Sequence, residues 1–246
     1  MRLNVVPAAS ALLAASCFFA AAPALAGDAA QFDPIGFSED GRYFAYEEYG
    51  IQDGSGFPYD NIYLIDLIAD EWVGKPVRVR VDDETAGLPA ARQQAMSAAK
   101  AMLDKAALVV PAQILTLNAD GEVGANGTEV SFGMFGNGLD TVRDPFALSL
   151  STFESTTTEP CASYGMEGAV KGLALSLADS AGNAAEIYRD ASVPASRGCV
   201  SDYRIHAVVA PFPAGLSASP MVAVISVYSL GFEGPDRRFV TIPTAP

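Results

Sequence analysis

Strand-length runs rich in apolar residues, many of them alternating with polar ones, recur along this chain and are separated by turn residues. A period of two places successive side chains on opposite faces of a β-strand, so each run predicts a strand with a buried face. Asp-Gly and similar pairs between runs predict tight turns, which join antiparallel neighbours. The runs lie at 31–38, 43–49, 61–67, 72–81, 113–117, 129–135, 146–153, 173–178, 184–188, 203–209, 221–230 and 238–242.

One segment has a different period. Between residues 87 and 108, apolar side chains recur at spacings of three and four, which predicts an amphipathic α-helix. Pro89 suits its first turn, and Pro111 lies just past its end. The apolar stripe is rich in Ala and Met, which is typical of a helix face packed against a core.

These elements predict a mainly β protein with one long helix, in the α+β class. An antiparallel β-meander over residues 32–81 comes first, and the helix follows it. A β-sandwich or partly closed barrel then completes the chain. We expect residues 27–246 to form one β-rich body, with a subdivision into 27–110 and 111–246 as the alternative.

The first 26 residues have the build of a secretory signal peptide. Arg2 precedes an apolar run over 5–22, and Ala24-Leu25-Ala26 forms a small-x-small cleavage signal. Cleavage after Ala26 predicts a periplasmic or secreted protein. No later stretch is long and apolar enough to span a bilayer as a helix. A lipoprotein box ending at Cys17 is the weaker alternative.

Removal of that peptide leaves two cysteines, Cys161 and Cys199. In an oxidising compartment, an isolated pair predicts a structural disulfide. A redox-active dithiol is the alternative, but it usually has Cys-x-x-Cys spacing and a lowered thiol pKa.

The chain is acidic. Removal of Arg2 leaves 14 basic side chains against 29 acidic ones, a formal net charge of −15 with His neutral. Nucleic-acid binding needs a basic patch, so this balance argues against a nucleic-acid partner. It also disfavours docking on anionic lipid headgroups.

No motif predicts a catalytic residue, a metal site or a cofactor. The one histidine, His206, lies in an alternating run, where a sheet-face role is expected rather than a place in a catalytic triad. Zinc needs a cluster of His, Cys or carboxylate ligands, which one His and an oxidised cysteine pair do not supply. Carboxylates near Asp53 and Asp120 lack EF-hand spacing, and turn formation explains them better.

Acidic and aromatic residues are mixed between 46 and 72. Glu47, Glu48, Asp60 and Asp66 lie among six aromatic residues, a composition that suits a saccharide or peptide groove. The simpler interpretation is a sheet with one aromatic core face and one acidic, solvated face. The aromatic residues are Tyr46, Tyr49, Phe57, Tyr59, Tyr63 and Trp72.

A long polar loop is expected from Gly50 to Asp60. Long ordered loops often carry function, so this loop is the candidate binding site. Its candidate contact residues are Tyr49, Asp53, Phe57, Tyr59 and Asp60.

Two resemblances follow from these segments. Residues 36–46, with their Ser-Glu-Asp-Gly turn, and Asn61-Ile62-Tyr63-Leu64-Ile65-Asp66 resemble one blade repeat of TolB-type, WD-like β-propellers. A propeller needs several blades, so one copy does not predict a closed propeller.

Over most of its mature length, the chain also resembles an uncharacterised family of predicted secreted bacterial proteins. The segments that carry this resemblance are 36–50, 54–59, 194–199 and 231–238. It implies secretion, a domain of unknown function and no established activity, so no catalytic residue is carried over.

Three functional hypotheses remain. The leading one is a non-enzymatic periplasmic or secreted protein that binds a partner, such as an envelope protein, or assists assembly in the cell envelope. The alternative is an envelope hydrolase that uses Glu47 or Glu48 to act on glycan. The third is a purely structural envelope protein without a discrete ligand.

Overall fold

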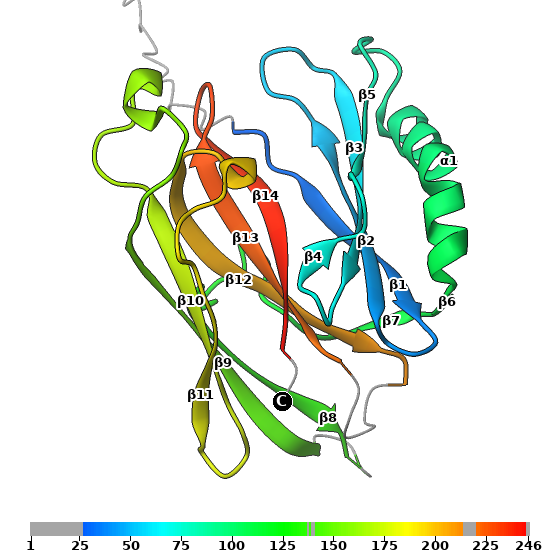
Figure 1. Cartoon of the computed structure of the whole chain (residues 1–246), viewed down its shortest axis with the longest axis vertical. Helices are drawn as coiled ribbons and strands as arrows, with labels where there is room; N and C mark the ends of the chain where they lie inside the picture. Colours follow the sequence, from blue (N-terminus) through cyan, green and yellow to red (C-terminus); the bar gives the residue numbers. More distant parts are fainter. Residues whose placement is uncertain (1–26, 137, 139–140, 214–219, 245–246) are drawn as a thin grey trace, which may run out of the picture.

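The computed structural model describes residues 27–136, 138, 141–213 and 220–244. Over these residues, three antiparallel sheets and one helix are stacked as four layers (Figure 1). The signal peptide and Cys17 lie outside the described ranges, so they stay predictions.

The first sheet is formed by the N-terminal strands and is called the helix-covered sheet. Its strand order is β4-β3-β2-β1-β6. Strands β4 and β5 both pair with the same edge of β3, β4 at its C-terminal end and β5 nearer its N-terminal end. The meander β1–β2–β3 therefore agrees with the alternation in the sequence. The strands are β1 (Gln31–Ser38), β2 (Tyr43–Ile51), β3 (Pro58–Asp66), β4 (Glu71–Trp72), β5 (Val77–Arg80) and β6 (Leu108–Val110).

The helix α1 (Leu88–Ala106) lies across one face of this sheet (Figure 1). Pro89 stands in its first turn, and Ala107 ends it in the left-handed conformation. Its buried face is made of Ala91, Ala95 and Ala99, and these small side chains let the helix approach Ile62 of β3 closely.

The remaining strands form two further sheets. The central sheet has the order β14-β13-β12-β7, and the outer sheet has the order β11-β10-β9-β8. Short 3₁₀ helices η1 (Cys161–Tyr164) and η2 (Ala195–Arg197) lie in the connections. The strands are β7 (Ala112–Leu117), β8 (Glu129–Phe135), β9 (Val142–Glu154), β10 (Lys171–Ala178), β11 (Ala184–Arg189), β12 (Val200–Pro211), β13 (Val222–Leu230) and β14 (Pro235–Pro243).

The central sheet is buried on both faces. On one face, Val222 and Val224 pack against aromatic side chains of the helix-covered sheet, such as Phe44. On the other face, Ile225 and Val227 pack against the outer sheet. A strand buried on both faces needs apolar residues at nearly every position, which explains the unbroken apolar run of β13.

The predicted fold class is confirmed: the protein is mostly β, with one helix and antiparallel sheets, and it forms no closed barrel or closed propeller over the described residues. The strand expected over 72–81 is wrong, because a turn at Gly74, with φ of 77°, divides it into β4 and β5. The subdivision at residues 110 and 111 stays a prediction.

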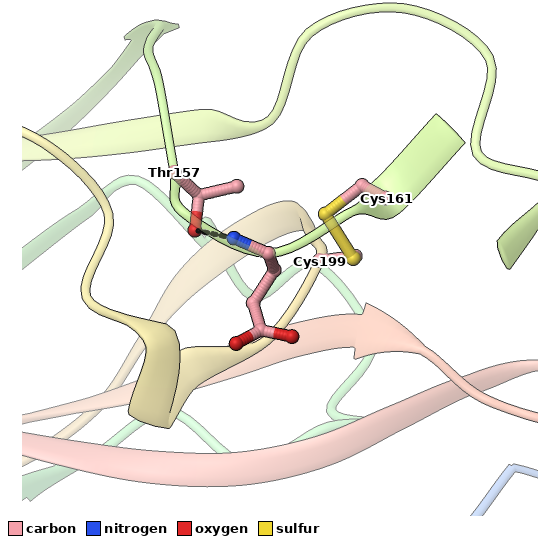
Figure 2. Close-up of a disulfide and its surroundings, with 4 residues drawn as sticks. Thr157, Cys161 and Cys199 are labelled. Carbon is pink, nitrogen blue, oxygen red and sulfur yellow. Dashed lines mark hydrogen bonds between the residues drawn. A yellow bond between two sulfur atoms is a disulfide. The ribbon is translucent and has the colours of Figure 1, made fainter. Parts of the chain in front are cut away.

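The expected disulfide is present. Cys161, at the start of η1, is bonded to Cys199, which directly precedes β12 (Figure 2). Both cysteines are buried in the core between the central and outer sheets. The bridge thus ties the long connection after β9 to the residue that directly precedes the central strand β12.

We expect the paired substitution Cys161→Ser and Cys199→Ser to lower the free energy of unfolding by about 4 kcal/mol, because the bridge closes a 38-residue loop in the unfolded chain. Urea unfolding of the oxidised protein and the variant measures this difference. Equal unfolding midpoints would contradict a structural role for the bridge.

Candidate functional site

A cleft of about 520 Å³ opens between the helix-covered sheet and the central sheet. Strands β2, β3, β4 and β5 form one wall, and β14 forms the other, with residues of β11 and η2 beside it. The cleft therefore collects segments that are far apart in the sequence.

A row of aromatic rings runs from the core to the mouth of this cleft. The rings of Tyr46 and Tyr63 stack with centroids 4.8 Å apart, and the ring of Trp72 lies 5.7 Å beyond Tyr63. Tyr46 and Tyr63 are buried, whereas Trp72 is 45 % exposed. The row thus ends in a supported aromatic ring that solvent can reach.

At the inner end of the cleft, the carboxylate of Glu48 joins the two sheets. The Phe239 backbone N–H on β14 donates to its Oε2 at 2.8 Å, and the Asn61 amide donates to its Oε1 at 3.2 Å. The Tyr46 hydroxyl donates to the Phe239 carbonyl at 3.3 Å. Side chains of β2 therefore occupy backbone groups that β14, as an edge strand, leaves without a strand partner.

Burial has an electrostatic consequence for Glu48, which is 1 % exposed. Loss of solvation raises the pKa of this carboxyl, although the nearby Arg238 guanidinium and the hydrogen-bond donors act in the opposite direction. Since both oxygens accept hydrogen bonds, the group holds the two walls in register.

Three arginines line the cleft, and two of them are fixed by carboxylates. Arg197 donates to both oxygens of buried Asp190, at 2.9 and 2.8 Å, and Arg238 donates to Asp28 at 2.6 Å. Arg78 on β5 is exposed, and its side chain forms no ion pair or hydrogen bond with the described residues. Its guanidinium is therefore available to a ligand.

The opposite face of the helix-covered sheet holds an acidic cluster beneath α1. Arg92 of the helix bonds to Glu47 and to Asp33, the latter at 2.9 Å, and its guanidinium lies 4.1 Å from the centroid of the Tyr49 ring. The expectation of a solvated acidic face is wrong, because the helix covers Glu47 and Asp60.

Asp60 is the least satisfied member of this cluster. Its side chain is 0 % exposed, and neither carboxylate oxygen has a hydrogen-bond partner among the described residues. Burial and the neighbouring Glu47 carboxylate raise the pKa of Asp60 to about 8. Asp60 is therefore protonated at neutral pH in the folded protein and ionised in the unfolded chain.

This difference predicts a pH dependence of stability. Binding of a proton by Asp60 contributes to the free energy of unfolding. This contribution is fully present below about pH 4 and is lost as the pH rises through about 8, by up to about 1.4 kcal/mol per pH unit. We expect Asp60→Asn to remove that loss, so the variant gains stability over the wild type as the pH rises. Urea unfolding across this range tests it, with Asp33→Asn as the control; parallel curves for Asp60→Asn and wild type would refute the assignment.

The expected binding loop is shorter than the sequence suggested. Pro58–Asp60 belong to β3 and residues 50–51 to β2, so the loop spans only 52–57. Tyr59 is 5 % exposed and donates to Asp28 at 2.7 Å, and Asp60 points to the opposite face of the sheet. Of the candidate contacts, only Asp53 and Phe57 lie in the loop, where both are half-buried, and a binding role for them stays a prediction.

Replacement of Tyr59 and Phe57 by Ala separates packing from surface contact. We expect Tyr59→Ala to cost roughly 3–5 kcal/mol of stability, because it removes a buried ring and its hydrogen bond to Asp28. Phe57→Ala should cost no more than about 1 kcal/mol. Thermal or urea unfolding measures both, and similar losses in the two variants would contradict this placement.

The two glutamates chosen for a hydrolase do not converge. Glu47 and Glu48 are consecutive residues of β2, so their side chains point to opposite faces of the sheet. His206 packs against Phe239, with ring centroids 4.8 Å apart, and burial lowers its pKa to about 4, so it is neutral at pH 7. The described residues hold no group of three or more His, Cys, Asp or Glu that suits a metal ion.

Sequence reasoning placed Trp72, Tyr46 and Glu48 among the mixed acidic and aromatic residues, and the structure brings them to one cleft. It missed Arg78 and Arg238. Alternation in β5 predicts an outward face for Arg78, but no local pattern shows that this face borders β14.

The architecture is that of a β-rich protein with a disulfide and a cleft between two of its sheets. A family model described as "Predicted secreted protein (DUF2259)" matches residues 45–244, so the chain belongs to this family of predicted secreted proteins. The comparison with curated proteins gives no match. None of the helices in the described residues has the length and hydropathy needed to cross a membrane.

Proposed function

We propose that this secreted protein is a non-enzymatic binding protein of the cell envelope and that its ligand occupies the cleft between the helix-covered and central sheets. One observation carries the proposal: the exposed ring of Trp72 and the uncommitted guanidinium of Arg78 line the same cleft of about 520 Å³. A concave site with aromatic walls and a few polar groups is typical of ligand binding.

The bonding of Glu48 supports binding over catalysis. Both of its oxygens accept hydrogen bonds from Phe239, Asn61 and Tyr63, so its charge is used to hold the walls together. A general acid must instead direct its proton at a substrate atom. The cleft is thus a preformed cavity with its inner polar groups already satisfied.

The fluorescence of Trp72 tests the proposal, because it is the only tryptophan in the chain. We expect a low-molecular-mass fraction of a bacterial envelope extract to shift its emission and to protect it from acrylamide. Arg78→Ala should weaken the response, and Arg80→Ala, on the same strand but outside the cleft lining, should leave it unchanged. A response in no fraction, or one that is equal in both variants, would contradict a binding role for the cleft.

A carboxylate hydrolase is the second candidate, since Glu48 lines the cleft and burial raises its pKa. It predicts release of reducing sugar from envelope glycan that Glu48→Gln abolishes and Glu47→Gln, which alters the opposite face of the sheet, preserves. Absence of turnover by the wild type would remove this candidate.

A further inference from the structure

We infer that the cleft binds a neutral oligosaccharide, with one sugar ring packed on Trp72. This inference rests on the proposed binding function and adds the chemical class of the ligand. Its basis is an exposed aromatic ring in one cleft with donors and acceptors that have no partner within the described ranges of the chain.

The Trp72 ring is supported from behind by the helix-covered sheet. Strand β4 is only two residues long, but Trp72 pairs with Ile65 of β3, and its ring lies against Tyr63, which in turn stacks on Tyr46. A ring held in this way offers flat apolar area at a small cost in conformational entropy. The C–H face of a sugar ring matches such a surface.

Exposed polar side chains that have no partner among the described residues also line the cleft. Arg78 supplies donors, Glu71 supplies acceptors, and the Ser196 hydroxyl supplies both; all three are exposed and line the cleft. Sugar hydroxyls donate and accept, so they can satisfy each of these groups. A lipid chain or apolar peptide would bury the same groups without partners, which is unfavourable.

The cleft carries charges of both signs. The chain has a formal net charge of −14, and Glu48, Asp70 and Glu71 line the cleft, so a polyanion would meet repulsion. A cation would meet Arg78, Arg197 and Arg238 in the same space. Opposed charges of this kind favour a ligand that is uncharged and rich in hydroxyl groups.

Calorimetric and fluorescence titrations of the mature, oxidised protein test the inference. The probes are cellohexaose, maltohexaose and the hexamer of N-acetylglucosamine, with oligogalacturonate as an anionic probe and tetralysine as a cationic one. We expect at least one neutral hexasaccharide to bind saturably and to change Trp72 emission. The two charged probes should not bind.

The variants identify the site. We expect Trp72→Ala and Arg78→Ala each to weaken that binding about tenfold, which corresponds to about 1.4 kcal/mol, while Arg80→Ala stays within about twofold. Trp72→Ala is read by calorimetry, since it removes the fluorophore, and circular dichroism verifies its fold. Equal affinities for Arg78→Ala and Arg80→Ala would overturn the inference.

The two proposals fail in different ways. If an extract fraction protects Trp72 but no neutral hexasaccharide binds, or if a charged probe binds instead, the saccharide assignment is wrong and the binding function stands. If neither the extract nor any probe changes the emission of Trp72, both proposals are wrong.

Discussion

The burial of the central sheet on both of its faces is the constraint on which the rest of the structure depends. A sheet with two apolar faces is stable only between two other layers, and here aromatic side chains cover one face and aliphatic side chains the other. The helix-covered sheet then has its own second face to bury, and α1 covers it (Figure 1). The order of the four layers follows from this requirement.

The acidic residues of β2 and β3 show how the layers change the chemistry of a side chain. Glu48 and Asp60 are both buried, yet Glu48 accepts hydrogen bonds from two neighbouring segments, whereas the Asp60 carboxyl has none within the part of the chain that the structure describes. Burial therefore fixes Glu48 as a connection between sheets and leaves Asp60 dependent on a proton. The two carboxyl groups have different roles because the two faces of one sheet meet different layers.

Much of the fold could be predicted from the sequence, because alternation and turn residues are local signals. The helix at 88–106, most of the strands, the meander and the disulfide belong to this group. The position of Asp60 under α1 could not be predicted, since alternation assigns a residue to a face but does not say what covers that face. Pro58 and Tyr59 lie in β3 rather than in the expected loop, because Pro is common in both loops and strand ends.

The candidate site was less predictable than the fold. The local composition indicates Trp72 and Glu48. Arg78 and Arg238 can be recognised as cleft residues only when β14 is known to lie beside β2 and β3. This packing brings together residues roughly 190 positions apart, such as Glu48 and Phe239. The periodicity of a single sequence does not predict contacts between segments so far apart. Contacts between sheets, rather than within them, mark the limit of the sequence-based interpretation.

The capped edge of β14 has a consequence for association between copies of the protein. An open strand edge is a template on which a second chain can add, and this is a common start of aggregation. Here residues 28–30 bridge to Arg237, and the side chains of Glu48 and Tyr46 occupy the backbone of Phe239, so this part of the edge is closed from within. The polar groups that shape the inner end of the cleft thereby also protect this β-rich protein against edge-to-edge self-association.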